Sequence, residues 1–172
     1  MRRDRSRAVN DRSTQGMRVT CQTALALVLA LMIMGCSGMP ENDIDPNKVT
    51  ELARCPSSPN CVSSVEEADD SHYIAPISIQ GDADESWQTL REILGDERSF
   101  DIVASSDDYL RAVATTRILR FKDDVEFLLD RAAGRIDMRS ASRIGYSDLG
   151  KNRKRLESIR TKMINAGAAR SD

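Results

Sequence analysis

The stretch "DDVEFLLDRAAGRIDMRSAS", Asp123 to Ser142, decides the fold. Apolar residues recur at every second position in both of its halves, at Val125, Phe127, Leu129, Ile136 and Met138. This alternation predicts two strands, because successive side chains in a strand point to opposite faces of a sheet. The small residues at 132–134 between the halves are typical of a tight turn. We therefore expect a hairpin with one apolar face.

The opposite face of this hairpin carries charge of both signs. With the turn centred between residues 132 and 133, Asp130 lies opposite Arg135, and Glu126 lies opposite Arg139. Such cross-strand pairs would fix the register, since a slip of one residue would bury charge. The acidic residues expected on this outward face are Asp124, Glu126 and Asp130. We interpret these charges first as structural ion pairs.

The flanking segments complete an α+β pattern. Residues 72–80, 100–105 and 109–117 have strand character, the last two around a polar turn. A helix is expected after Asp82, which with Glu85 resembles a capping box, and it ends at Gly95. Its apolar stripe is Trp87, Leu90 and Leu94, and the stripe of a second helix over 149–166 is Leu149, Leu156, Ile159 and Met163. The order β-α-β-β-β-β-α predicts an antiparallel sheet of about five strands with two helices packed on one face.

Charge is unevenly distributed along the 172 residues. The net charge is −2, which argues against a nucleic-acid partner. Residues 37–110 hold 17 acidic and 4 basic residues, whereas residues 111–172 hold 8 acidic and 15 basic residues. Within one domain, mutual neutralisation is the simpler interpretation, and a basic patch for a partner is the alternative.

The N-terminal part has the pattern of a secretory signal. After Met17, which is an alternative start, a single Arg18 precedes eleven apolar residues at 24–34. A helix of that length is about 16 Å long, too short for a bilayer core of about 30 Å. "IMGC", ending at Cys36, resembles a bacterial lipobox, which implies a diacylated Cys36, and Ser37 after it implies outer-membrane sorting in a Gram-negative cell. A plain cleaved signal peptide and a membrane-anchoring helix are the alternatives.

These patterns predict the domain organisation. We expect a signal peptide with lipobox at 1–36, a flexible tether at 37–54, one globular domain at 55–166 and a disordered tail at 167–172. The expected location is the cell envelope, anchored to the membrane through N-terminal acyl chains and facing the periplasm.

Two cysteines remain for the domain, Cys55 and Cys61 in "RCPSSPNC". In an exported protein an isolated pair favours a disulfide, and the prolines between them supply turn chemistry. A redox-active pair is the alternative, although its usual spacing is C-x-x-C. A zinc site would need four ligands, and His72 is the only histidine, so neither a metal nor a cofactor is expected.

The segment Met138–Arg160 gathers the basic residues most suited to an anion. The candidate anion-binding residues are Arg139, Ser142, Arg143 and Arg153. They surround the start of the last helix, where free N–H groups favour phosphate or carboxylate. Ser147 or Asp148 would cap that helix, and Asp148 would otherwise fill the site and pair with an arginine. Asn152 is expected on the inward face as a structural amide, and the remaining basic residues of the helix, Lys151, Lys154, Arg155 and Lys162, on a solvated face.

Four segments together resemble one family, known only as domain of unknown function 1499. They are "CPSSPNCVSS" at 55–64, the helix around Trp87, "DDVEF" at 123–127 and "RSASRIGYSDLGKNRKR" at 139–155. The resemblance implies an exported or membrane-associated domain and implies no activity.

The function expected from the sequence is that of a non-enzymatic binding or scaffolding domain. Its partners would be the membrane and either an envelope protein or an anionic small molecule. The alternatives are a module that binds a small anion or lipid headgroup through the arginine cluster, and an enzyme of unrecognised type. The sequence contains no histidine-based triad around His72 and no glycine-rich phosphate loop. It does not predict an oligomeric state.

Overall fold

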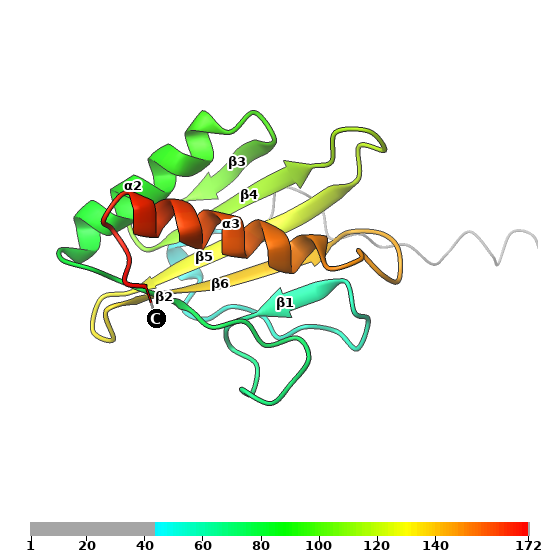
Figure 1. Cartoon of the computed structure of the whole chain (residues 1–172), viewed down its shortest axis with the longest axis horizontal. Helices are drawn as coiled ribbons and strands as arrows, with labels where there is room; N and C mark the ends of the chain where they lie inside the picture. Colours follow the sequence, from blue (N-terminus) through cyan, green and yellow to red (C-terminus); the bar gives the residue numbers. More distant parts are fainter. Residues whose placement is uncertain (1–43, 172) are drawn as a thin grey trace, which may run out of the picture. The chain divides into compact units, whose positions relative to one another are not determined.

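The computed structural model describes residues 44–171. The elements in chain order are η1 (Pro46–Lys48), β1 (Cys61–Ser63), β2 (Ile77–Ser78), α2 (Ala83–Asp96), β3 (Phe100–Ser105), β4 (Tyr109–Thr115), β5 (Lys122–Asp130), β6 (Arg135–Ser142) and α3 (Lys151–Asn165). The six strands form one sheet in the order β1-β6-β5-β4-β3, with β2 also paired to β6, and every pairing is antiparallel. Both helices lie on one face (Figure 1). The expected α+β fold is confirmed.

The central hairpin has the predicted register. In the β5–β6 pair, Glu126 is opposite Arg139 and Asp130 is opposite Arg135. The apolar residues of both strands are buried on the helix side, where the core residues are Val125, Phe127, Leu129, Ile136 and Met138. Polar–apolar alternation alone was sufficient to place these side chains, because one face of this hairpin is fully covered.

The two helices cover the apolar face of the sheet. Asp82 accepts hydrogen bonds from the backbone amides of Asp84 and Glu85 and so begins α2 as expected. The buried stripes are Trp87, Leu90 and Leu94 on α2 and Leu156, Ile159 and Met163 on α3. Leu149, expected on the stripe of α3, instead precedes the helix with a φ of 56° and is 82% exposed. The prediction failed there because Leu149 shares the heptad spacing of the stripe but lies in the turn.

The segment before β1 forms a second layer, on the other face of the sheet. It passes behind the sheet in the view of Figure 1. Leu52 is buried, and the carbonyl of Pro46 accepts a hydrogen bond from the Ser106 hydroxyl at 3.1 Å. The expectation of a flexible tether at 37–54 is therefore wrong for residues 44–54, which pack on the domain because Leu52 has apolar surface to cover. Residues 37–43 and the proposed signal peptide with Cys36 lie outside the described residues.

The C-terminal residues are also part of the domain. Ala168 and Ala169 are buried, and Ala169 forms a bridge with Ile79. The Arg170 backbone N–H donates to the Ser78 carbonyl, and its guanidinium donates to the Ile79 carbonyl at 2.9 Å. The disordered tail expected at 167–172 is wrong for 167–170, because this segment supplies backbone partners to the β2 region. Within residues 44–171, no helix has the length and apolarity needed to cross a membrane.

Candidate functional site: an arginine–carboxylate network

Asp124 on β5 joins two arginines on the sheet face away from the helices. Arg111 on β4 donates to Oδ1 from Nε at 3.2 Å and from an Nη at 2.8 Å. Arg143, just after β6, donates to both carboxylate oxygens at 3.0 and 2.9 Å. Burial alone would raise the pKa of Asp124, but the hydrogen bonds and charges of the two guanidiniums outweigh burial and hold that pKa below its usual value. Asp124 is therefore an anion with its partners already in place.

Glu126 forms the second centre on the same face. Arg139 donates to Glu126 Oε2 at 2.8 Å, and the Tyr109 hydroxyl donates to Oε1 at 2.8 Å. Tyr109 is fully buried, and burial together with the neighbouring Glu126 charge raises the pKa of its phenol far above the usual value. Tyr109 thus stays protonated and serves as a donor to the carboxylate.

Asn152 forms a polar centre on the helix side of the sheet. It is 1% exposed, and its Oδ1 accepts from the Ser140 hydroxyl at 2.7 Å. Its Nδ2 donates to the Asn60 carbonyl at 2.7 Å and to the Ser142 hydroxyl at 3.1 Å. The expected inward, structural role of Asn152 therefore takes the form of a tie between α3, the end of β6 and the chain entering β1.

Arg155 extends this centre. It was expected on a solvated face, but its guanidinium is largely buried, where it pairs with the Asp123 carboxylate and donates to Asn152 and Ser140. Asp123 is 3% exposed. The correction has a geometric reason: Asp123 precedes Asp124 on a strand, so the two carboxylates point to opposite faces of the sheet and each recruits its own arginine.

The predicted anion-binding residues do not converge on a common point. Arg139 pairs with Glu126 and Arg143 pairs with Asp124, both on the sheet face away from the helices. Arg153 lies on α3 and donates to the Ser71 carbonyl at 2.9 Å, and Ser142 accepts from Asn152. The sequence placed these side chains near one another along the chain, but the sheet separates them.

Asp148 caps α3 through its side chain. Its Oδ1 accepts from the Gly150 amide at 2.9 Å and its Oδ2 accepts from the Asn152 amide at 2.6 Å. Gly150, at the cap position itself, has a φ of 74° that favours glycine. The carboxylate thus occupies the start of the helix, as one alternative predicted, but the expected N-cap at Ser147 or Asp148 is wrong, because the helix begins later and its N-cap is Gly150.

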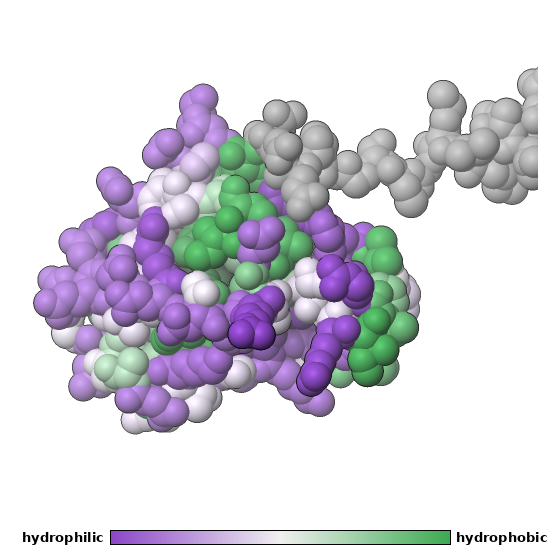
Figure 2. Space-filling view, turned by 90° about the horizontal axis from the view of Figure 1, so that it is seen from above, coloured by the Kyte–Doolittle hydropathy of each residue, from purple (hydrophilic) through white to green (hydrophobic). Residues whose placement is uncertain are grey.

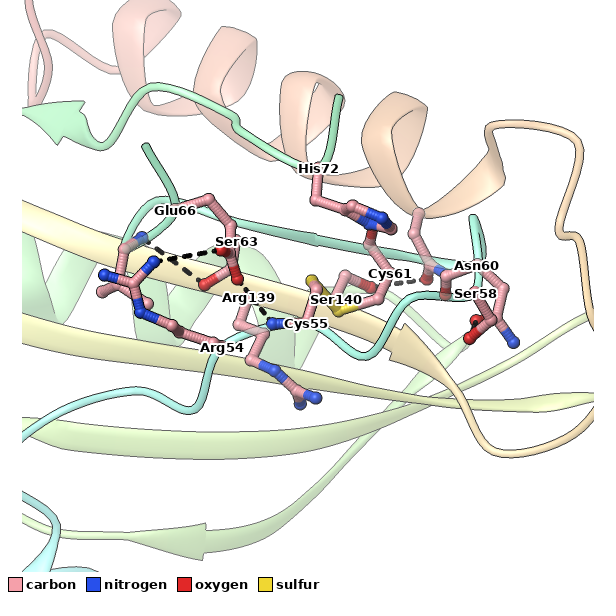
Figure 3. Close-up of a disulfide and its surroundings, with 12 residues drawn as sticks. Arg54, Cys55, Ser58, Asn60, Cys61, Ser63, Glu66, His72, Arg139 and Ser140 are labelled. Carbon is pink, nitrogen blue, oxygen red and sulfur yellow. Dashed lines mark hydrogen bonds and ion pairs between the residues drawn. A yellow bond between two sulfur atoms is a disulfide. The ribbon is translucent and has the colours of Figure 1, made fainter. Parts of the chain in front are cut away.

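The disulfide centre lies beside the network. Cys55 and Cys61 are bonded, with their Cα atoms 5.6 Å apart, as expected from the sequence. Figure 3 shows the Cys55 amide and the Arg54 guanidinium directed at the Glu66 carboxylate, which accepts from Cys55 at 2.5 Å. His72 hydrogen-bonds the Cys61 carbonyl through Nδ1 at 2.8 Å. The single histidine therefore holds the backbone of this segment.

Weaker pairs complete the outward face of the hairpin. The Arg135 guanidinium lies 3.8 Å from Asp130 and 3.3 Å from Asp137, and Asp137 accepts from the Ser64 hydroxyl at 2.9 Å. Arg135 is nearly half exposed, so these contacts contribute little to stability compared with the pairs at Asp124 and Glu126.

Sequence reasoning missed four members of these networks: Asn60, Tyr109, Arg111 and Asp123. For Arg111 a signal was present, since an arginine inside the otherwise apolar strand "YLRAVAT" must find a partner if it is buried. For Asn60 the sequence held no such signal, because Asn60 contributes its backbone carbonyl, which contacts Asn152, 92 residues further along the chain.

Within residues 44–171 there is no group of three or more histidine, cysteine, aspartate and glutamate side chains placed to hold a metal ion. A hollow of about 510 Å³ lies between the N-terminal layer and the sheet, next to Leu52, Leu128 and Asp137. A smaller, mainly apolar groove of about 270 Å³ lies at the end of the domain that carries Phe121 and Ile144.

Fold and networks together define a small α+β domain whose arginines and carboxylates mainly bind one another. The chain belongs to the family described as "Protein of unknown function (DUF1499)", whose model matches residues 51–163. That match includes the disulfide, the sheet and most of α3. No curated protein and no solved structure matches the chain.

Proposed function

We propose that this chain is a lipid-anchored, non-enzymatic domain of the cell envelope that acts by binding or scaffolding. Its anchor is an acylated Cys36, and its domain faces the periplasm, on the outer membrane in a Gram-negative cell. The Cys55–Cys61 disulfide supports an oxidising compartment, because exported proteins are where such bonds persist.

The observation that carries the non-enzymatic part is that the guanidiniums of the cluster pair with carboxylates of the same domain, although Arg139 Nε is buried without a hydrogen-bond partner among the described residues. Arg111 and Arg143 are both committed to Asp124, and Arg139 is committed to Glu126. A catalytic or anion-binding arginine needs donors that are directed at a ligand, whereas these guanidiniums already have carboxylates of opposite charge. The arrangement supports a stabilising role for the cluster.

The anchor is tested by the intact mass of the protein purified from membranes. We expect a chain that begins at Cys36 and carries the added mass of acyl groups, and we expect Cys36→Ala to remove that mass and release the chain from the membrane fraction. A mature chain with an unmodified N-terminus, or one recovered from the cytosol, contradicts the proposal.

The role of the arginine cluster is tested by thermal unfolding. Phosphate, nucleotides and soluble phospholipid headgroups are each added over a concentration series, and a ligand that occupies the folded state raises the Tm by mass action. We expect no such rise, and we expect Arg143→Ala to lower the Tm without any ligand. A Tm that rises with one of these anions and no longer rises in Arg143→Ala would favour an anion-binding module instead.

A further inference from the structure

Two loops at one end of the domain expose most of its large apolar side chains. They are the β4–β5 connection, 116–121, and the β6–α3 connection, 143–150, which lie at the same end of the sheet in Figure 1. Six of the eight exposed large hydrophobic residues in the described chain belong to them: Ile118, Leu119, Phe121, Ile144, Tyr146 and Leu149. We call these six residues the apolar tip. Figure 2 shows hydrophobic surface at that end of the domain, bordered by hydrophilic side chains.

The exposure at the tip is extreme. Ile118 is 88% exposed, Leu149 is 82% exposed and Tyr146 is 75% exposed. Soluble domains rarely gather this much apolar surface in one place unless it meets a partner or a membrane. The groove of about 270 Å³ lies within the tip, between Leu119, Phe121, Ile144 and Leu149.

The backbone of both loops is unusual at the same place. Arg120 has a φ of 51° and Leu149 a φ of 56°, and these are the two residues other than glycine with positive φ among residues 44–171. This conformation is costly for a residue with a branched or long side chain, and glycine or asparagine would adopt it more readily. Strained positions of this kind cluster at functional segments. Here the strain accompanies the display of Leu149 to solvent.

The charge around the tip is almost wholly positive. The basic residues within or directly beside the two loops are Arg117, Arg120, Lys122 and Lys151, besides Arg143, whose guanidinium pairs with Asp124. Asp148 is the one acidic residue of the two loops, and its carboxylate is used by the amides that begin α3. Apolar side chains bordered by arginine and lysine, with a tyrosine among them, have the composition of a segment that enters the interface of an anionic bilayer.

We propose that the apolar tip inserts into the interfacial region of an anionic lipid bilayer, with Arg117, Arg120 and Lys151 at the lipid phosphates. The proposal goes beyond the anchor at Cys36, because it assigns a second membrane contact and an orientation. It takes a lipid surface as the occupant since charge complementarity and apolar exposure are found together on the two loops.

The chain length is compatible with simultaneous contact of anchor and tip, a step that rests on the proposed anchor. Pro46 is held at Ser106, at the end of β4 remote from the tip. β4 has seven residues and spans about 20 Å. Ile118 lies three residues beyond β4, so the distance to bridge is about 30 Å, and the link from Cys36 to Pro46 reaches about 35 Å when extended. The acyl groups on Cys36 and the apolar tip can therefore reach the same membrane.

The test uses the full chain with lipid vesicles and places a tryptophan at each end of the folded domain. Ile118→Trp reports from the tip, and the matched control Ala132→Trp reports from the exposed turn at the other end of the β5–β6 hairpin; the native Trp87 is buried and common to both. We expect the fluorescence of Ile118→Trp to shift to the blue and to be quenched by brominated lipid in vesicles that contain phosphatidylglycerol. Ala132→Trp should do neither.

Charge reversal tests the basic border. In the Ile118→Trp background, Arg117→Glu should lower the insertion equilibrium about fivefold or more. Lys48→Glu, a matched reversal on exposed η1 at the remote end, should leave it unchanged. Pure phosphatidylcholine vesicles should give weaker quenching than the anionic ones.

Each failure has a separate signature. If Cys36 proves unmodified, the proposed anchor fails, but vesicles added to the chain still measure the tip. Absence of quenching at Ile118→Trp while the chain remains bound to anionic vesicles overturns the tip proposal. A dimer in detergent-free solution that Leu149→Asp dissociates also overturns it, because a second copy would then cover the tip.

Discussion

Asp124 shows at the residue scale how a carboxylate can hold three strands together. Its two arginine partners come from β4 and from the end of β6, and its own side chain is 19% exposed. Asp124→Asn would leave both guanidiniums largely buried without an opposite charge. We expect a loss of about 3 kcal/mol in the free energy of unfolding at pH 7, measured by urea denaturation.

The pH dependence of this loss follows from the direction of the pKa shift. Because the pKa of Asp124 is lower in the folded than in the unfolded chain, its contribution is fully present above the unfolded value of about 4. That contribution disappears as the pH falls through the folded value. The difference between the wild type and Asp124→Asn should therefore shrink below pH 4.

The matched control is Asp84→Asn, which removes an exposed pair with Arg131. We expect a change below about 1 kcal/mol at pH 7. Equal losses in the two variants would mean that burial of the Asp124 pairs does not matter.

Tyr109 gives the opposite pH dependence. Its phenol has a raised pKa in the fold, so the proton stays bound there while the unfolded chain ionises near pH 10. The contribution of Tyr109 to the free energy of unfolding is present below pH 10 and declines as the pH rises further. Tyr109→Phe should cost about 2 kcal/mol at pH 7 through the lost hydrogen bond to Glu126, and this cost should decrease above pH 10.

Tyr146→Phe is the natural comparison for Tyr109, because Tyr146 is exposed. The Tyr146→Phe variant should be as stable as the wild type at pH 7 by chemical denaturation. A loss in Tyr109→Phe that stays constant from pH 8 to pH 11 would contradict the role given to the buried phenol.

At the scale of the elements, predictability depended on whether one local pattern decided the structure. The β5–β6 hairpin followed from alternation because its apolar and charged faces have unequal environments. The pairs Glu126–Arg139 and Asp130–Arg135 followed from that register. β1 was not predicted, since three residues beside a disulfide have no period, and its place depends on pairing with Ser140 and its neighbours on β6.

The candidate site was less predictable, because no local sequence pattern decides which residues from distant segments meet there. Proximity along the chain suggested that Arg143 and Arg153 share a ligand, whereas the sheet gives them unrelated partners. The residue that joins the elements is Asn152, whose inward face was predicted from helical spacing but whose partners come from three segments. Only the folded topology brings these partners to one amide.

Asn152→Ala tests this junction of elements. Without the amide, the Asn60 carbonyl and the Ser140 hydroxyl lose a buried partner. We expect a loss of about 3 kcal/mol in thermal or urea unfolding. Asn165→Ala, at the exposed end of α3, should change stability by less than about 0.5 kcal/mol. A similar small change at Asn152 would show that water replaces the amide there.

At the scale of the whole molecule, the sheet has two unlike layers. The helix layer is apolar and continuous, whereas the N-terminal layer contributes Leu52, a disulfide and polar contacts such as Cys55 with Glu66. Free energies of local opening follow buried apolar contact, so the two layers should open at different energies. The disulfide would then restrain the weaker layer.

Reduction of Cys55–Cys61 separates these layers experimentally. Opening so short a loop should cost about 2 kcal/mol. We expect hydrogen exchange to accelerate at the amides of 61–64 on reduction, or in Cys55→Ser with Cys61→Ser, while the amides of α3 keep their protection. The β1–β6 pairing is the element at risk, because it is only three residues long. Uniform acceleration in both layers would instead mean that the N-terminal layer and the helix layer unfold as one cooperative unit, so that the molecule does not divide into two layers of different stability.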